Sequence, residues 1–341
     1  MRTIALFLLA ALAASSLHAA SYQQNDGTII DPIQYYHLYH APGIHPYAGA
    51  NLQPFANLPG VDMSYAELRF ANLNNADLAG ADLSRALLWV ANLNHSDLAG
   101  ADLSYTNLVA ADLNDADLNQ ADLNHADLRT AELINANLTD ANLWAASLQE
   151  ANLTDADLTG ASLVGANLRW ADFTNAHLNG TDLTNADLHG ANLYYANLSV
   201  ANLYEAELNN ADMTYAKLKL AEMSNADLSG ANLSFADLSY ASIHYAWLNN
   251  ADMTGADLSF ASLFETNLSG AMFSTAENWN TANWSGSFYY IDNVPTWASG
   301  MDPIALGILA VDRPAVPEPT TLLLALLGLS LLPRRRRQNA A

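Results

Sequence analysis

The chain has 341 residues, with 35 Asp and Glu against 12 Lys and Arg, a formal net charge of −23 and no cysteine. The absence of cysteine excludes disulfides, thiolate catalysis and cysteine-ligated zinc. An acidic surface disfavours binding to nucleic acid and to anionic lipid.

Residues 1–20 have the order of a signal peptide. Arg2 supplies a basic start, residues 4–14 form an apolar run, and residues 15–20 are small or polar. The run is shorter than the roughly 20 residues that span a membrane, and the alanines at its end suit cleavage after Ala19 or Ala20. We therefore expect export, with signal peptidase as a partner; the alternative is a short buried N-terminal helix.

Residues 21–55 are rich in Tyr, His and Pro and precede a regular repeat. We expect them to cap that repeat, because an exposed strand edge would pair with another molecule. His37, His40 and His45 lie in this segment. His37 and His40 could pair on a local turn to hold a metal, but a surface histidine cluster is the favoured interpretation.

A five-residue repeat occupies residues 56–275 and indicates one elongated domain. From Leu58 to Phe273 every fifth residue is apolar, 37 of these 44 positions are Leu, and Ala holds 39 of the 44 positions two residues earlier. A period of five fits neither a helix nor a simple strand. We predict a four-sided coil of twenty residues per turn with Leu and Ala inside. Stacking at about 4.8 Å would give about eleven coils and a rod of about 50 Å.

Units such as Ala81-Asp82-Leu83 and Ala121-Asp122-Leu123 resemble the pentapeptide-repeat family, A(D/N)LXX. The resemblance implies an all-β, right-handed quadrilateral β-helix. Because Leu and Ala would fill the interior, no room remains inside for a substrate or cofactor. We therefore predict a protein without enzymatic activity or cofactor that acts through its faces or ends.

Twenty-residue spacing also aligns acidic side chains on successive coils. The expected columns are Asp62, Asp82, Asp102 and Asp122 on one face, and Asp77, Asp97 and Asp117 on another. Carboxylates about 5 Å apart repel one another, and bound Ca²⁺ or a basic partner could relieve the repulsion. The favoured interpretation is that these side chains accept hydrogen bonds from nearby backbone at the corners of the coil.

Aromatic side chains align in the same way. The expected columns are Tyr195, Tyr215 and Phe235, and Tyr240 with Phe260. The favoured interpretation is stacking that stabilises the coil; the alternative is a surface for sugar rings or another protein. Four outward-facing tryptophans could contribute to such a surface: Trp89, Trp144, Trp170 and Trp247. His95 and His125 are thirty residues apart and are expected on different faces, which disfavours a shared metal.

Residues 276–315 are expected to close the C-terminal end of the coil or to form a homodimer contact, which the family resemblance also implies. Their aromatic residues are Trp279, Trp284, Phe288, Tyr289, Tyr290 and Trp297.

Residues 316–341 resemble the PEP-CTERM sorting tail. The motif is Pro317, Glu318 and Pro319, then the apolar residues 320–332, then Arg334, Arg335, Arg336 and Arg337. The resemblance implies processing by an exosortase-type enzyme. Basic residues stay on the cytoplasmic side, and thirteen helical residues reach about 20 Å across a hydrocarbon core of about 30 Å. We expect transient inner-membrane anchoring through residues 320–332; a stable short anchor and a soluble helix are the alternatives.

Three classes of function remain open. We favour an exported structural or binding scaffold at the cell surface or in the exopolysaccharide matrix, with exopolysaccharide or surface proteins as partners, because PEP-CTERM systems are associated with exopolysaccharide production. The resemblance to quinolone-resistance members implies an acidic rod that imitates DNA and binds a topoisomerase, which export disfavours. A polysaccharide-active β-helix enzyme is disfavoured because uninterrupted pentapeptides leave no loops for a cleft.

Overall fold

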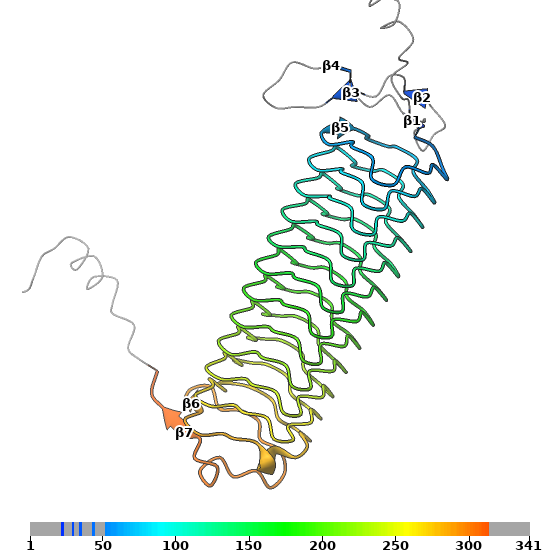
Figure 1. The fold of residues 1–341 in the computed structure, drawn as a ribbon. Coiled ribbons are helices and arrows are strands. Elements are labelled where there is room, and N and C mark those ends of the chain that lie inside the picture. The colour runs from blue at the N-terminus through cyan, green and yellow to red at the C-terminus, as the bar shows by residue number, and fades with distance from the viewer. Residues whose placement is uncertain (1–21, 24–28, 31–33, 36–42, 45–51, 314–341) are drawn as a thin grey trace, which may run out of the picture.

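The computed structural model describes residues 22–23, 29–30, 34–35, 43–44 and 52–313. Figure 1 shows a long four-sided coil whose turns stack along one axis. The expected signal peptide at residues 1–20 and the expected sorting tail at residues 316–341 lie outside the described residues, as do His37, His40 and His45.

The turns of the coil pair with each other in parallel, twenty residues apart. One series of bridges joins Asp62 to Asp82 and Asp82 to Asp102, and the regular spacing continues as far as the bridge from Asp257 to Glu277. Every fifth residue makes such a bridge, so each pentapeptide forms one side of the coil. The predicted quadrilateral β-helix with twenty residues per turn is confirmed.

The interior is filled by the residues that the repeat predicts. Every apolar residue at five-residue intervals from Leu58 to Phe273 is buried, with at most 8% of its surface exposed. Full burial of one such side chain contributes about 1.5–3 kcal/mol. Threonine replaces the inward alanine at three buried places, and each hydroxyl donates to a carbonyl of the preceding coil at 2.7–2.9 Å. These are Thr106, Thr181 and Thr266.

Each corner of the coil is a tight turn with one residue at positive φ. The amide of Ala81 donates to the carbonyl of Leu78 at 2.9 Å, and Gly80 between them has φ +64°. A positive φ at the second central residue is that of a type II turn, which favours glycine. Most corners hold other residues, such as Tyr105 at φ 57°. The amide of Tyr105 donates to the backbone carbonyl of Asn124 on the next coil at 2.9 Å. This bond helps to offset the cost of a positive φ in a residue with a Cβ, which is about 1–2 kcal/mol.

Short antiparallel strands meet the N-terminal end of the coil. β3 (Gln34–Tyr35) pairs with β5 (Ala66–Glu67) of the first turn and with β4 (Gly43–Ile44). β1 (Tyr22–Gln23) pairs with β2 (Ile29–Ile30). β3 thus pairs with the edge of the ladder at β5, and most of the predicted cap at residues 21–55 lies outside the described residues.

The last turn of the coil is enlarged. Beyond Glu277 the ladder continues with Asn283, Phe288 and Thr296, which pair with residues 21, 21 and 24 positions earlier. This turn contains the 3₁₀ helix η1 (Trp279–Thr281) and begins β6 (Phe288–Tyr290). β6 pairs in parallel with β7 (Leu309–Val311), which follows it at the C-terminal end (Figure 1).

Aromatic rings close the core at the C-terminal end. The ring of Trp297 stacks on the buried Phe273 at 5.6 Å between centroids, and Trp284, 2% exposed, meets the same ring edge-on at 5.6 Å. Trp284 and Trp297 follow the regular repeat along the chain. The segment after the repeat therefore covers Phe273, the last inward apolar residue of the repeat. Among the residues placed by the structure, no helix has the length and apolar character needed to cross a membrane.

Candidate functional surfaces

The aspartates of the repeat complete the hydrogen bonding of the backbone. In residues 81–85, four of the five amides donate to carbonyls at 2.8–2.9 Å, three of them on neighbouring coils and one across the turn. The fifth amide, of Ser84, donates to Oδ1 of Asp82 at 3.0 Å. The carboxylate thus takes the place of a missing backbone acceptor, which explains why Asp or Asn suits this position.

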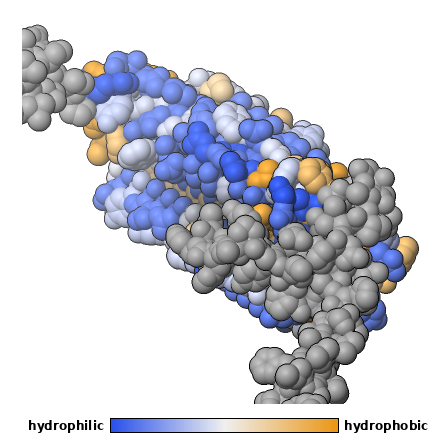
Figure 2. Space-filling model, turned by 90° about the horizontal axis from the view of Figure 1, so that it is seen from above, coloured by the Kyte–Doolittle hydropathy of each residue, from blue (hydrophilic) through white to orange (hydrophobic). Residues whose placement is uncertain are grey.

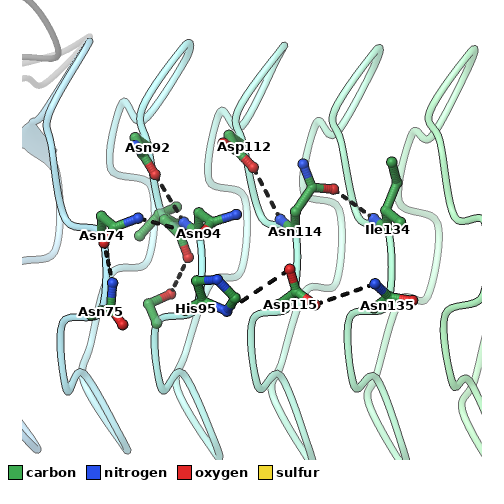
Figure 3. A network of polar contacts seen from close by, with 12 residues as sticks. Asn74, Asn75, Asn92, Asn94, His95, Asp112, Asn114, Asp115, Ile134 and Asn135 are labelled. Carbon is green, nitrogen blue, oxygen red and sulfur yellow. Dashed lines mark hydrogen bonds and ion pairs between the residues drawn. The ribbon is translucent and has the colours of Figure 1, made fainter.

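All seven aspartates of the two expected columns make this same bond. Each accepts from the amide two residues further on, at 2.9–3.2 Å. Figure 3 shows the equivalent bonds from Asn94 to Asn92 and from Asn114 to Asp112. The bridges confirm that the aspartates stack in columns, and the hydrogen bonds confirm their role as acceptors for the backbone.

Asparagine relieves the charge repulsion further along each column. Nδ2 of Asn137 donates to Asp117, and Nδ2 of Asn142 donates to Asp122, both at 2.9 Å. Within the described part of the chain, no three His, Asp or Glu side chains gather in a way that could hold a metal ion.

Asp257 shows how these bonds affect ionisation. Partial burial raises its pKa, but this is outweighed by hydrogen bonds from Asn278 and from the hydroxyl and amide of Ser259, so the pKa of Asp257 lies below its ordinary value. The bonds favour the charged carboxylate.

The two aromatic columns are stacked ladders. Tyr215 lies between Tyr195 and Phe235, with centroids 4.8 and 5.1 Å away and rings within 14° of parallel. Tyr240 and Phe260 stack at 5.0 Å. Stacking turns the ring faces toward each other and leaves mainly the edges exposed, so a sugar cannot lie flat on an inner ring. The geometry favours the stabilising interpretation of these columns.

The second ladder continues an apolar column that the sequence-based prediction missed. Val200 and Leu220 precede Tyr240 at twenty-residue spacing and are more than half exposed. Between the two columns lie Lys217 and Lys219, the only lysines of the chain, and both are exposed. Figure 2 shows that hydrophilic residues cover most of the described surface in that view.

The four tryptophans do not share one surface. Trp144, Trp170 and Trp247 are about half exposed. Trp89 is less exposed and packs edge-on against Phe70, with ring centroids 4.5 Å apart. Trp144 meets His125, and Trp170 meets His189, both edge-on.

His95 and His125 have separate contacts, as their thirty-residue spacing predicts. His125 stacks on Tyr105 with ring centroids 4.7 Å apart. His95 Nδ1 lies 3.8 Å from Asp115 Oδ2 (Figure 3). Neither contact brings them together.

A recess of about 440 Å³ opens on the face of Trp247, beside the enlarged last turn. Its lining is Trp247, Asn249, Asn250, Asn267, Ser269, Phe288, Tyr290, Asn293 and Arg313. The sequence pattern indicated Trp247 as an outward residue but gave no sign of the recess.

The repeat matches a known family model, described as Pentapeptide repeats. The matched stretches overlap and together cover residues 55–129 and 136–276, which is more than half of the chain. Among curated proteins, none shows significant similarity to the chain.

Several solved structures are similar to the chain. HetL, a pentapeptide repeat protein involved in heterocyst differentiation regulation from the cyanobacterium Nostoc sp. strain PCC 7120, is 39% identical over 64% of this chain and 89% of its own, with a TM-score of 0.24. QnrB1, a plasmid-mediated fluoroquinolone resistance protein, is 19% identical over 59% and 94%, with a TM-score of 0.34. A pentapeptide repeat protein from the thylakoid lumen of Arabidopsis thaliana is 29% identical over 33% and 68%, with a TM-score of 0.17.

Proposed function

Because the chain belongs to the pentapeptide-repeat family, we propose that it is a non-catalytic scaffold that binds partners on the outer faces and ends of its β-helix. The observation that supports this most is the filled interior: the inward Leu and Ala side chains from Leu58 to Phe273 leave no space there for a substrate. Binding must therefore use the exterior, where the backbone is regular and rigid.

The proposal includes export and a place at the cell surface or in the exopolysaccharide matrix. Its support is in the sequence at both ends: the apolar run of residues 4–14 with a small-residue end, and the Pro317-Glu318-Pro319 motif before an apolar segment and four arginines. Signal peptidase and an exosortase-type enzyme would be the processing partners, with transient anchoring through residues 320–332.

Mass spectrometry of the protein from fractionated cells tests this part. We expect the protein outside the cytoplasm, without residues 1–20 and cut near Pro319. Replacing Pro317, Glu318 and Pro319 with alanine should retain the tail and hold the protein at the inner membrane. An intact protein in the cytoplasm would contradict export.

An acidic rod that binds a topoisomerase is the second candidate. The formal net charge of −23 on a rod favours it. A DNA-supercoiling assay with gyrase separates the two candidates: inhibition by the purified chain, together with an intact cytoplasmic product, would favour the acidic rod over the exported scaffold.

A further inference from the structure

The recess beside Trp247 exists because the last turn departs from the repeat. With the regular spacing of twenty, residue 287 would pair with Asn267 and residue 292 with Met272. Instead Phe288 pairs with Asn267, one residue later, and Thr296 pairs with Met272, four residues later. The added residues bring Asn293 over the corner at Gly270, where its backbone carbonyl accepts from the Gly270 amide at 2.8 Å. Its side chain donates to Asn250 at 3.1 Å. The bulge thus forms one wall of the recess.

The lining is rich in amides and carries no carboxylate. Asn249, Asn250, Asn267 and Asn293 line the recess, and none of the lining residues is Asp or Glu although the chain carries 35 of them. A side-chain amide offers both a donor and an acceptor. The one charged lining residue, Arg313, lies over the ring of Tyr290 at 5.1 Å and pairs with Asp292 at 3.1 Å. The guanidinium is therefore positioned and its charge is partly balanced.

Trp247 occupies a position that Asp or Asn holds in most of the pentapeptides. Its counterparts one turn before and after, Asp227 and Asn267, accept the amide two residues further on at 2.9 and 3.1 Å. An indole cannot accept that bond. Trp247 is the only Trp, Tyr or Phe at this position among the 44 pentapeptides. Leu87, Lys217 and Met272 also lack an acceptor oxygen at this position, but of these departures only Trp247 lines the recess. Departures from a local rule are expected at functional sites.

The indole of Trp247 is as exposed as the outer ladder rings but lies at the recess. It is 57% exposed, and it stands beside the recess rather than within a stacked column. An exposed indole beside several amides fits a ligand with one apolar face and many hydroxyl groups. Small-molecule sites commonly combine aromatic walls with a few placed polar groups, in pockets of about 300–1,000 Å³.

We propose that this recess binds a hexopyranose unit of a polysaccharide. The C–H face of the sugar lies on the Trp247 indole, and the amides of Asn249, Asn250 and Asn293 bond its neighbouring hydroxyls. Arg313 extends recognition to a sugar that carries a carboxylate. The inference deepens the proposed function, since it supplies the contact through which an exported scaffold would hold a matrix polysaccharide.

Binding to an array of oligosaccharides tests the proposal. The purified chain is applied to neutral glucan and galactan oligomers and to uronic-acid oligomers, and the best ligand is then titrated by calorimetry. We expect saturable binding with one site per chain. The two groups of sugars decide whether Arg313 takes part in binding. If uronic-acid oligomers bind more tightly, this preference should be lost in Arg313→Gln. If neutral and uronic-acid oligomers bind equally, recognition is assigned to the amides and the indole.

Trp247→Asn is the decisive variant because it restores the repeat. The asparagine can accept the amide of residue 249, so the variant should fold with an unchanged or higher melting temperature but lose sugar binding. Trp170→Ala is the control: Trp170 is similarly exposed at 55% but lies four turns away, and binding should be unchanged. Wild-type affinity in a folded Trp247→Asn variant would overturn the proposal. Failure of every sugar to bind the wild-type chain would also overturn it, while the localisation and processing that test the scaffold proposal would be unaffected.

Discussion

Replacement of Asp122 separates a structural role for the acidic columns from a role for their charge. Asp122→Ala removes the oxygen that accepts from the amide of Asn124 at 3.1 Å and from the side chain of Asn142 at 2.9 Å. Leaving a buried donor unpaired costs about 1–3 kcal/mol. Since the site is half-buried and water can partly replace the acceptor, we expect a loss of about 1–2 kcal/mol in unfolding free energy.

Asp122→Asn is the matched control, since it keeps an acceptor oxygen and removes only the charge. The charge on Asp122 lies next in its column to that on Asp102. Two charges about 5 Å apart repel by about 0.8 kcal/mol in water, less with salt. The asparagine variant should therefore be as stable as the parent or slightly more stable.

Urea unfolding followed by circular dichroism measures both variants, with and without Ca²⁺. Hydrogen exchange of residues 121–125 supplements it, because long repeat arrays need not unfold in two states. The backbone-acceptor account predicts that only the alanine variant loses protection at Asn124 and that Ca²⁺ has no effect. Equal losses in both variants, or a Ca²⁺-dependent stabilisation that Asp122→Asn abolishes, would refute it.

Three further predictions concern the core, a corner and pH. Leu143→Ala, in a fully buried position, should cost about 2–5 kcal/mol in urea unfolding. Gly190→Ala should lower the melting temperature more than Gly180→Ala, because both have positive φ but only at Gly190 would a Cβ overlap a side chain, that of Trp170. The hydrogen bonds of Asp257 lower its pKa below 3.8, so its contribution to stability is present above that value and is lost as pH falls through the lower folded pKa. Asp257→Asn should consequently lose less in melting temperature than the parent between about pH 6 and pH 2.

The repeat alone determined the architecture of residues 56–275. A period of five with Leu and Ala at fixed places allows only a coil that turns every five residues, and Leu103, Leu123 and Leu143 are fully buried in it. Twenty-residue spacing then correctly predicted the stacked aspartates and the stacking of Tyr195 with Tyr215. These predictions succeeded because a strict repeat converts distance along the sequence into position in space.

The tertiary structure decided what those columns can do. The sequence left open whether Asp82 or Tyr215 meets a ligand; the bonded amide of Ser84 and the stacked rings around Tyr215 assign both to the coil itself. The recess depends on three irregular spacings after Glu277 and on Arg313, which lies far from Trp247 along the chain. Such a site arises where the repeat ends, and a periodic pattern carries no information about the shape of its own interruption.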